Sequence, residues 1–125
     1  MKTILDFPLE GIRRKLLRFV SAGAATEYIN DEIVKSGCMH VITRIALENE
    51  TTAFTRFRIG VWDGANFQLE EEQKSPAAAT LYWTTEPIYL SESENLRIEL
   101  KGCASGDVVR VYIDSFVKKF SGEGK

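Results

Sequence analysis

The chain has 125 residues, of which 44% are hydrophobic and 27% are charged, and its formal net charge is −2. This length suits a single domain that buries enough apolar surface to fold without a metal or a disulfide. Because Lys and Arg nearly balance Asp and Glu, a general affinity for nucleic-acid phosphate is excluded.

Residues 1–22 are predicted to form an N-terminal arm or an edge segment of the domain. Residues 1–5 begin like a signal peptide, but acidic residues and Pro8 interrupt the apolar run, so neither a signal peptide nor a membrane span is expected. Residues 12–20 fit either a helix or a strand. We favour a strand, because the later segments read as strands.

A basic cluster lies within this N-terminal segment. Arg13, Arg14 and Arg18, with Lys15 between them, are predicted to dock on the acidic surface of a partner. The alternative is a solvated face beside the apolar residues of the same segment.

Residues 23–120 are predicted to form the folded domain, and residues 121–125 a frayed tail. From residue 37 onward, apolar and polar residues alternate with a period of two in short runs that are separated by turns. In the first run, His40 falls on the solvated face. The inward face of that run is Met39, Val41, Thr43, Ile45 and Leu47.

The next runs continue the strand pattern. Phe57, Ile59 and Val61 point inward, and Trp62, which is out of phase with them, falls on the outer face. Residues 67–69 suit a short strand that ends before the three glutamates at 70–72. Short strands are also expected at residues 81–84 and 88–90.

Residues 96–101 and 109–114 alternate strictly on either side of a glycine-containing turn, which predicts an antiparallel hairpin with one buried face. The outer face of this pair, Tyr112 included, alternates in charge without assembling a site. The inward residues are Leu96, Ile98, Leu100, Val109, Val111 and Ile113. Seven or eight short strands and no long helix predict an all-β, antiparallel β-sandwich, jelly-roll-like, with an N-terminal arm.

No catalytic or metal-binding constellation is predicted. His40 is the single histidine, and no serine lies in the context of a nucleophile beside it. Cys38 and His40 lie on the same side of a strand, but even with Cys103 they fall short of the four ligands of a structural zinc site. We expect no cofactor, and we expect both cysteines to be free thiols rather than a disulfide.

Three aromatic residues are predicted as contacts for a ligand or a partner: Trp62, Tyr82 and Trp83. An exposed tryptophan can stack on a sugar ring or anchor a protein interface. The alternative is a structural role, in which a loop or the N-terminal segment covers these aromatic side chains. Tyr82 and Trp83 are neighbours in one strand, so they are expected to point to opposite faces.

The stretches 37–51, 58–64 and 88–97 carry a resemblance to a known class of proteins. Their rhythm of strands and turns is similar to that of small β-sandwich virion proteins of tailed bacteriophages, which decorate a capsid or complete a tail or neck. The resemblance covers roughly residues 37–116, and residues 1–36 have no counterpart in it.

The resemblance implies a non-enzymatic structural role in a virion whose components are made in the host cytoplasm. It implies contacts with other virion proteins and with further copies of the chain, through strand edges and the arm, and it implies no membrane and no specific nucleic acid. A carbohydrate-binding module that uses exposed aromatic residues is the alternative. An enzyme is not expected, because one histidine and scattered acids assemble no acid–base machinery.

Overall fold

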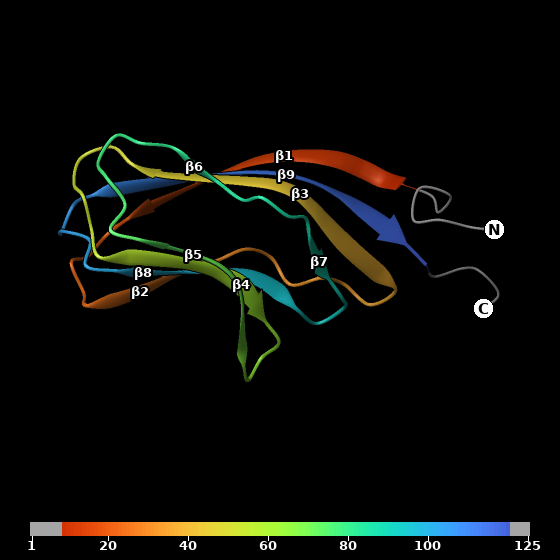
Figure 1. The fold of residues 1–125 in the computed structure, drawn as a ribbon. Helices are drawn as coiled ribbons and strands as arrows, with labels where there is room; N and C mark the ends of the chain where they lie inside the picture. The colour runs from red at the N-terminus through yellow and green to blue at the C-terminus, as the bar shows by residue number, and fades with distance from the viewer. Residues whose placement is uncertain (1–8, 121–125) are drawn as a thin grey trace.

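The computed structural model describes residues 9–120, and within them the chain forms nine antiparallel strands in two sheets (Figure 1). Sheet A contains β1 (Leu9–Val20), β9 (Val108–Lys119), β3 (Cys38–Asn49), β6 (Tyr82–Trp83) and β7 (Ile88–Leu90). Sheet B contains β2 (Thr26–Asn30), β8 (Asn95–Lys101), β4 (Arg56–Trp62) and β5 (Phe67–Lys74). The first eight residues of the predicted arm and the predicted tail, 121–125, lie outside the described residues.

The strand order is that of a jelly roll. Sheet A runs β1-β9-β3-β6, with β7 also paired to β3, and sheet B runs β2-β8-β4-β5. Strands that are neighbours in the sequence therefore alternate repeatedly between the sheets, which is how a jelly roll wraps its chain around one core. The predicted all-β, antiparallel, jelly-roll-like sandwich is confirmed.

The ambiguous segment at residues 12–20 is part of a strand. β1 pairs along its length with β9 and forms one edge of sheet A. Leu17 and Phe19 pack on the core, whereas Leu16 and Val20 are exposed on the other face. This alternation is the two-residue period of a half-buried strand, which a helix would not produce.

The core lies between the two sheets and is made of the predicted inward residues of the last strands. Leu96, Ile98 and Leu100 of β8 are each 1% exposed. Val109, Val111 and Ile113 of β9 are at most 2% exposed. Phe57, Ile59 and Val61 of β4 join the same cluster, as their alternation predicts.

The predicted hairpin between residues 96–101 and 109–114 is wrong in its pairing. β8 pairs with β2 and β4 in sheet B, whereas β9 pairs with β1 and β3 in sheet A. The turn between them therefore crosses the sandwich, with Gly102 and Gly106 at positive φ. Alternation requires only that each strand bury one face, and these two strands bury theirs against each other across the core.

The predicted inward face of β3 is also wrong in its first half. A register shift falls between Ile42 and Arg44, so Thr43 is an extra residue in the pairing with β9. A bulge of this kind reverses the face of every side chain before it. His40 is consequently 8% exposed and Ile42 2% exposed, whereas Thr43 lies in solvent. Val41 is also buried, at 4% exposed, but it does not belong to the core cluster that contains Ile42.

β5 extends beyond the predicted short strand. It continues through the glutamates at 70–72 to Lys74 because it pairs with β4 along this length, and Glu72 forms an ion pair with Arg58 at 3.5 Å. Cys38 and Cys103 are free, as expected. In residues 9–120 no helix is long and apolar enough to cross a membrane.

Candidate functional site

Exposed apolar side chains form a row across the outer face of sheet A. Leu16 of β1 lies opposite Tyr112 of β9. Tyr112 in turn lies opposite Ala46 of β3, and Ala46 lies opposite Trp83 of β6. Leu16, Trp83 and Tyr112 are 53%, 49% and 38% exposed, while the small Ala46 is buried between its neighbours.

A groove of about 400 Å³ follows this row. We call it the outer groove, and its apolar lining is Leu16, Leu81, Trp83 and Tyr112. A concave, largely apolar surface with a few polar groups at its rim is the usual form of a ligand site. The outer groove is therefore the candidate functional site.

The rim of the outer groove carries paired charges. Arg44 Nη2 lies 2.7 Å from Asp114 Oδ2, and Arg14 Nε lies 3.8 Å from Asp114 Oδ1. The guanidinium of Arg44 also lies 4.8 Å from the centre of the Trp83 ring. Farther along the rim, the Tyr112 hydroxyl donates a hydrogen bond to Glu48 Oε1 at 3.2 Å.

The three predicted aromatic contacts do not come together. Trp62 lies in sheet B, with the guanidinium of Arg97 3.8 Å from the centre of its ring. Tyr82 turns toward the core, where its ring packs edge-on against Phe57 at 5.9 Å. Trp83 alone lines the outer groove. Tyr82 and Trp83 point to opposite faces, as expected.

Sequence reasoning missed Leu16 and Tyr112 as members of the site. Strand alternation places Tyr112 on an outer face, and that signal is present in the sequence. Its neighbours across the sheet depend on the pairing of β9 with β1 and β3, which single-strand periodicity does not report.

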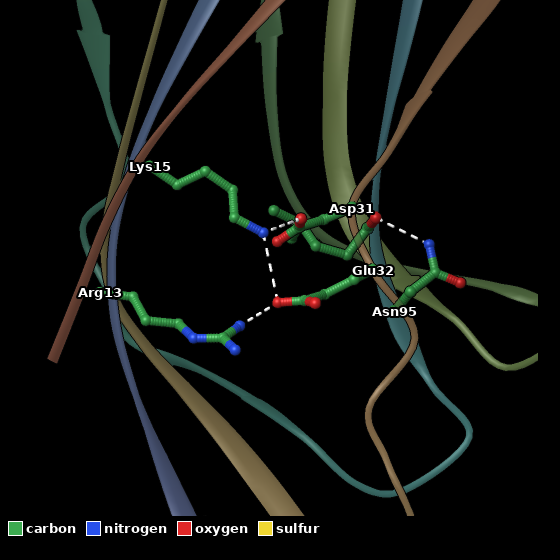
Figure 2. Close-up of polar contacts among 6 residues, drawn as sticks. Arg13, Lys15, Asp31, Glu32 and Asn95 are labelled. Carbon is green, nitrogen blue, oxygen red and sulfur yellow. Dashed lines mark hydrogen bonds and ion pairs between the residues drawn. The ribbon is translucent and has the colours of Figure 1, made fainter. Parts of the chain in front are cut away.

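The basic cluster of β1 is divided between two faces. Arg14 and Arg18 are exposed on the outer face, whereas Arg13 and Lys15 are half-buried on the inner one. Figure 2 shows that Arg13 pairs with Glu32, and that Lys15 Nζ lies 2.6 Å from Asp31 Oδ1 and 3.3 Å from Glu32 Oε1.

We call Arg13, Lys15, Asp31 and Glu32 the flank clamp. It joins β1 of sheet A to the segment that follows β2 of sheet B, at the side of the sandwich where these two edge strands lie. Charges that point inward from an edge strand also discourage unwanted strand pairing. The flank clamp therefore has a structural role that the sequence does not reveal.

The charges of the flank clamp affect the pKa of His40. Burial lowers the pKa of His40, and the charge of Arg13 lowers it further. The carboxylates of Glu32 and Asp31 oppose this shift without reversing it. For Glu32, burial raises the pKa, but Lys15 and Arg13 outweigh it and bring the pKa below its usual value.

We expect the free energy of unfolding to fall as the pH drops from about 7 to about 5. Since the pKa of His40 is lowered in the fold, the unfolded chain binds more protons in this range, and stability is lost below the ordinary value of 6.5. His40→Gln should flatten this slope in urea denaturation at several pH values. Glu70→Gln, at an exposed position of β5 in sheet B, is the control and should keep the slope. An undiminished slope in His40→Gln would contradict the expectation.

Chemistry based on cysteine or a metal has little support in the described residues. Burial and the nearby carboxylate of Asp107 raise the pKa of the Cys103 thiol to about 11, so this thiol is a poor nucleophile. No group of three or more His, Cys, Asp and Glu residues within 9–120 is placed to hold a metal ion.

The fold defines the chain as a jelly-roll β-sandwich protein. No family model and no curated protein sequence matches it. Among solved structures it is similar to a chain of infectious bursal disease virus Gx strain, with a TM-score of 0.51 and 10% identity over 92% of this chain. The alignment covers 33% of that viral chain, so the present chain spans about a third of its length.

Two further solved structures match at lower similarity. One is the N-terminal cellulose-binding domain of Cellulomonas fimi β-1,4-glucanase C, with a TM-score of 0.37 and 14% identity over 83% of this chain and 76% of that domain. The other is the virus-like particle of Macrobrachium rosenbergii extra small virus, with a TM-score of 0.37 and 10% identity over 93% and 86% of the two chains. At 10% identity, the match to the bursal disease virus chain indicates a shared fold only.

Proposed function

We propose that this protein is a non-enzymatic structural component of a phage-like particle, at the capsid surface or in the tail or neck. The observation that carries the proposal is the long edge strand β1, which within residues 9–120 pairs with β9 alone and presents exposed arginines. The jelly-roll fold, which the chain shares with a chain of infectious bursal disease virus, supports it. Free strand edges are natural points of assembly between subunits.

The charges on β1 indicate the kind of neighbour that it fits. The flank clamp already engages Arg13 and Lys15, so a neighbour with an acidic surface would meet the exposed Arg18 and, beside Asp114, the exposed Arg14. The chain has such a surface in β5, where Glu70 is exposed at the edge of sheet B. Self-association of this protein would therefore join unlike edges of successive copies.

The test is the charge reversal Arg14→Glu with Arg18→Glu. Removal of two favourable contacts should weaken self-association about tenfold or more, measured by light scattering. The same variant should no longer enter particles when it replaces the wild-type protein. The control, Lys101→Glu, reverses one charge at an exposed site of β8 in sheet B and should assemble normally. A wild-type protein that stays monomeric and absent from particles would refute the proposal.

A second candidate function is carbohydrate binding, and the outer groove specifically favours it. Trp83 and Tyr112 offer exposed aromatic surface beside carboxylate and guanidinium groups, and this combination suits sugar rings and their hydroxyls. Trp62 and Tyr82, two of the three predicted contacts, are engaged elsewhere. A virion protein with such a groove could carry both functions, because Arg18 lies outside the groove, whereas Arg14 belongs to both surfaces.

A further inference from the structure

We infer that the outer groove binds an oligosaccharide that carries carboxylate groups, with a sugar ring against Trp83 and Tyr112 and a carboxylate at Arg14 and Arg44. The inference rests on the carbohydrate-binding candidate and names its ligand class. It shares Arg14 with the assembly proposal, and Arg18, which does not line the groove, separates the two.

The proposed contact with a sugar ring rests on the apolar floor of the outer groove. Leu16, Tyr112 and Trp83 are each partly exposed in the described part of the chain, and Trp83 remains 49% exposed although Arg44 lies 4.8 Å from the centre of its ring. A pyranose ring has a face of C–H groups that packs on such a surface, and the volume of about 400 Å³ lies in the range of small-ligand sites.

The proposed contact with a carboxylate of the ligand rests on the arginines at the rim of the outer groove. Arg14 and Arg44 share the single carboxylate of Asp114, so one positive charge is left in excess at this end of the groove. The side chains of Arg14 and Arg44 are 83% and 56% exposed. Arg14 is the looser of the two, at 3.8 Å from Asp114. A guanidinium group can bind a carboxylate through two parallel hydrogen bonds, which makes an acidic ligand the natural partner of this end.

The position of the groove favours a saccharide over a peptide. An extended peptide usually gains affinity by pairing its backbone with a free strand edge. The groove instead crosses the face of sheet A, where β9 is already paired with a strand on each side. The remaining hydrogen-bonding groups are side chains, among them Asp114, Glu48 and the Tyr112 hydroxyl, and these suit sugar hydroxyls.

The test is calorimetric titration of the full chain with oligosaccharides rich in uronic acid (oligogalacturonate, alginate and hyaluronan fragments). Neutral cello-oligosaccharides and poly-glutamate of matched length are the comparison ligands. We expect at least one acidic oligosaccharide to bind, with an affinity that falls as salt is added. Trp83→Ala should weaken this binding about tenfold or more. Arg14→Gln should weaken acidic ligands alone, because it leaves the Arg44–Asp114 pair in place.

Two controls separate binding from folding and from assembly. Trp62→Ala removes a tryptophan outside the groove and should leave binding unchanged. Arg18→Glu should impair assembly and keep binding, because Arg18 does not line the groove. Thermal unfolding of each variant shows whether it is folded.

Each of the remaining outcomes of the titration would refute one part of the inference. Equal binding of neutral and acidic oligosaccharides would refute the role of the arginines and leave carbohydrate binding in place. Tighter binding of poly-glutamate would identify an acidic protein partner instead. No binding of any saccharide would refute both the inference and the carbohydrate candidate, whereas the assembly proposal would still stand on its own experiment.

Discussion

The substitution Asp107→Ala is expected to lower the free energy of unfolding by about 3 kcal/mol. Asp107 is buried at the end of the turn that crosses the sandwich. Its carboxylate accepts hydrogen bonds from Asn49 Nδ2 at 3.0 Å, from Thr52 Oγ1 at 2.9 Å and from the Ala104 N–H at 2.9 Å. Without the carboxylate these donors, of which Asn49 is fully buried, lose their partner, and an unsatisfied buried donor is costly.

Denaturation by guanidinium chloride at neutral pH measures this loss, and Asp63→Ala is the matched control. Asp63 also accepts backbone hydrogen bonds in a turn, from Ala65 at 2.9 Å and Asn66 at 2.7 Å, but it is exposed to solvent. Water replaces those bonds, so the loss in the control should be much smaller. Equal losses in the two variants would show that Asp107 is no more than an ordinary turn residue.

The same carboxylate predicts a loss of stability in acid. Burial raises the pKa of Asp107, but hydrogen bonds from Asn49, Ala104 and Thr52 outweigh it and lower the pKa below its ordinary value of 3.8. A lowered pKa in the fold means that the stabilisation is present above 3.8 and is lost as the pH falls through the folded value. Wild type and Asp107→Ala should therefore converge in stability in acid.

The substitution Gly60→Ala is expected to destabilise the fold by about 3 kcal/mol, although it adds a single methyl group. A Cβ at residue 60 would overlap the carbonyl oxygen of Gln68 and would lie 2.9 Å from the ring of Phe67. The Gln68 carbonyl belongs to the backbone of β5, so relief requires that β5 move away from β4. The register shift beside Gly60 leaves this backbone especially close.

The control is Gly106→Ala. Gly106 has φ of 89°, but a Cβ there would meet nothing within 4 Å. Only the penalty of placing alanine at positive φ remains, about 1–2 kcal/mol. Chemical denaturation of both variants ranks them, and a larger loss at Gly106 would mean that the close approach of β5 to Gly60 is readily relieved.

Alternation of apolar and polar residues was enough to predict the fold class and most of the core. Leu96, Ile98 and Leu100 are buried as their spacing requires, and so are Val109 and Ile113. The reason is local: in a strand, successive side chains point to opposite faces whatever the strand pairs with. Where the local rule was interrupted, at the bulge of Thr43, the prediction for His40 was wrong.

The choice of pairing partners needed the tertiary structure. The alternation of β8 and β9 is compatible with a hairpin and with a crossing between sheets, because both arrangements bury the same faces. The outer groove depends on that choice, since Tyr112 meets Leu16 and Trp83 only when β9 lies between β1 and β3. A site formed across three strands has no signature in any one of them.

The sequence by itself determined which faces of β4, β8 and β9 are buried and that the chain folds as an antiparallel sandwich. The tertiary structure alone decided that Arg13 turns inward to Glu32, that Arg97 covers Trp62, and that Trp83 remains exposed. Which face a side chain occupies is set within a few residues of backbone, except where a bulge intervenes. What it contacts on that face is set by residues far along the chain, through the packing of the whole sandwich.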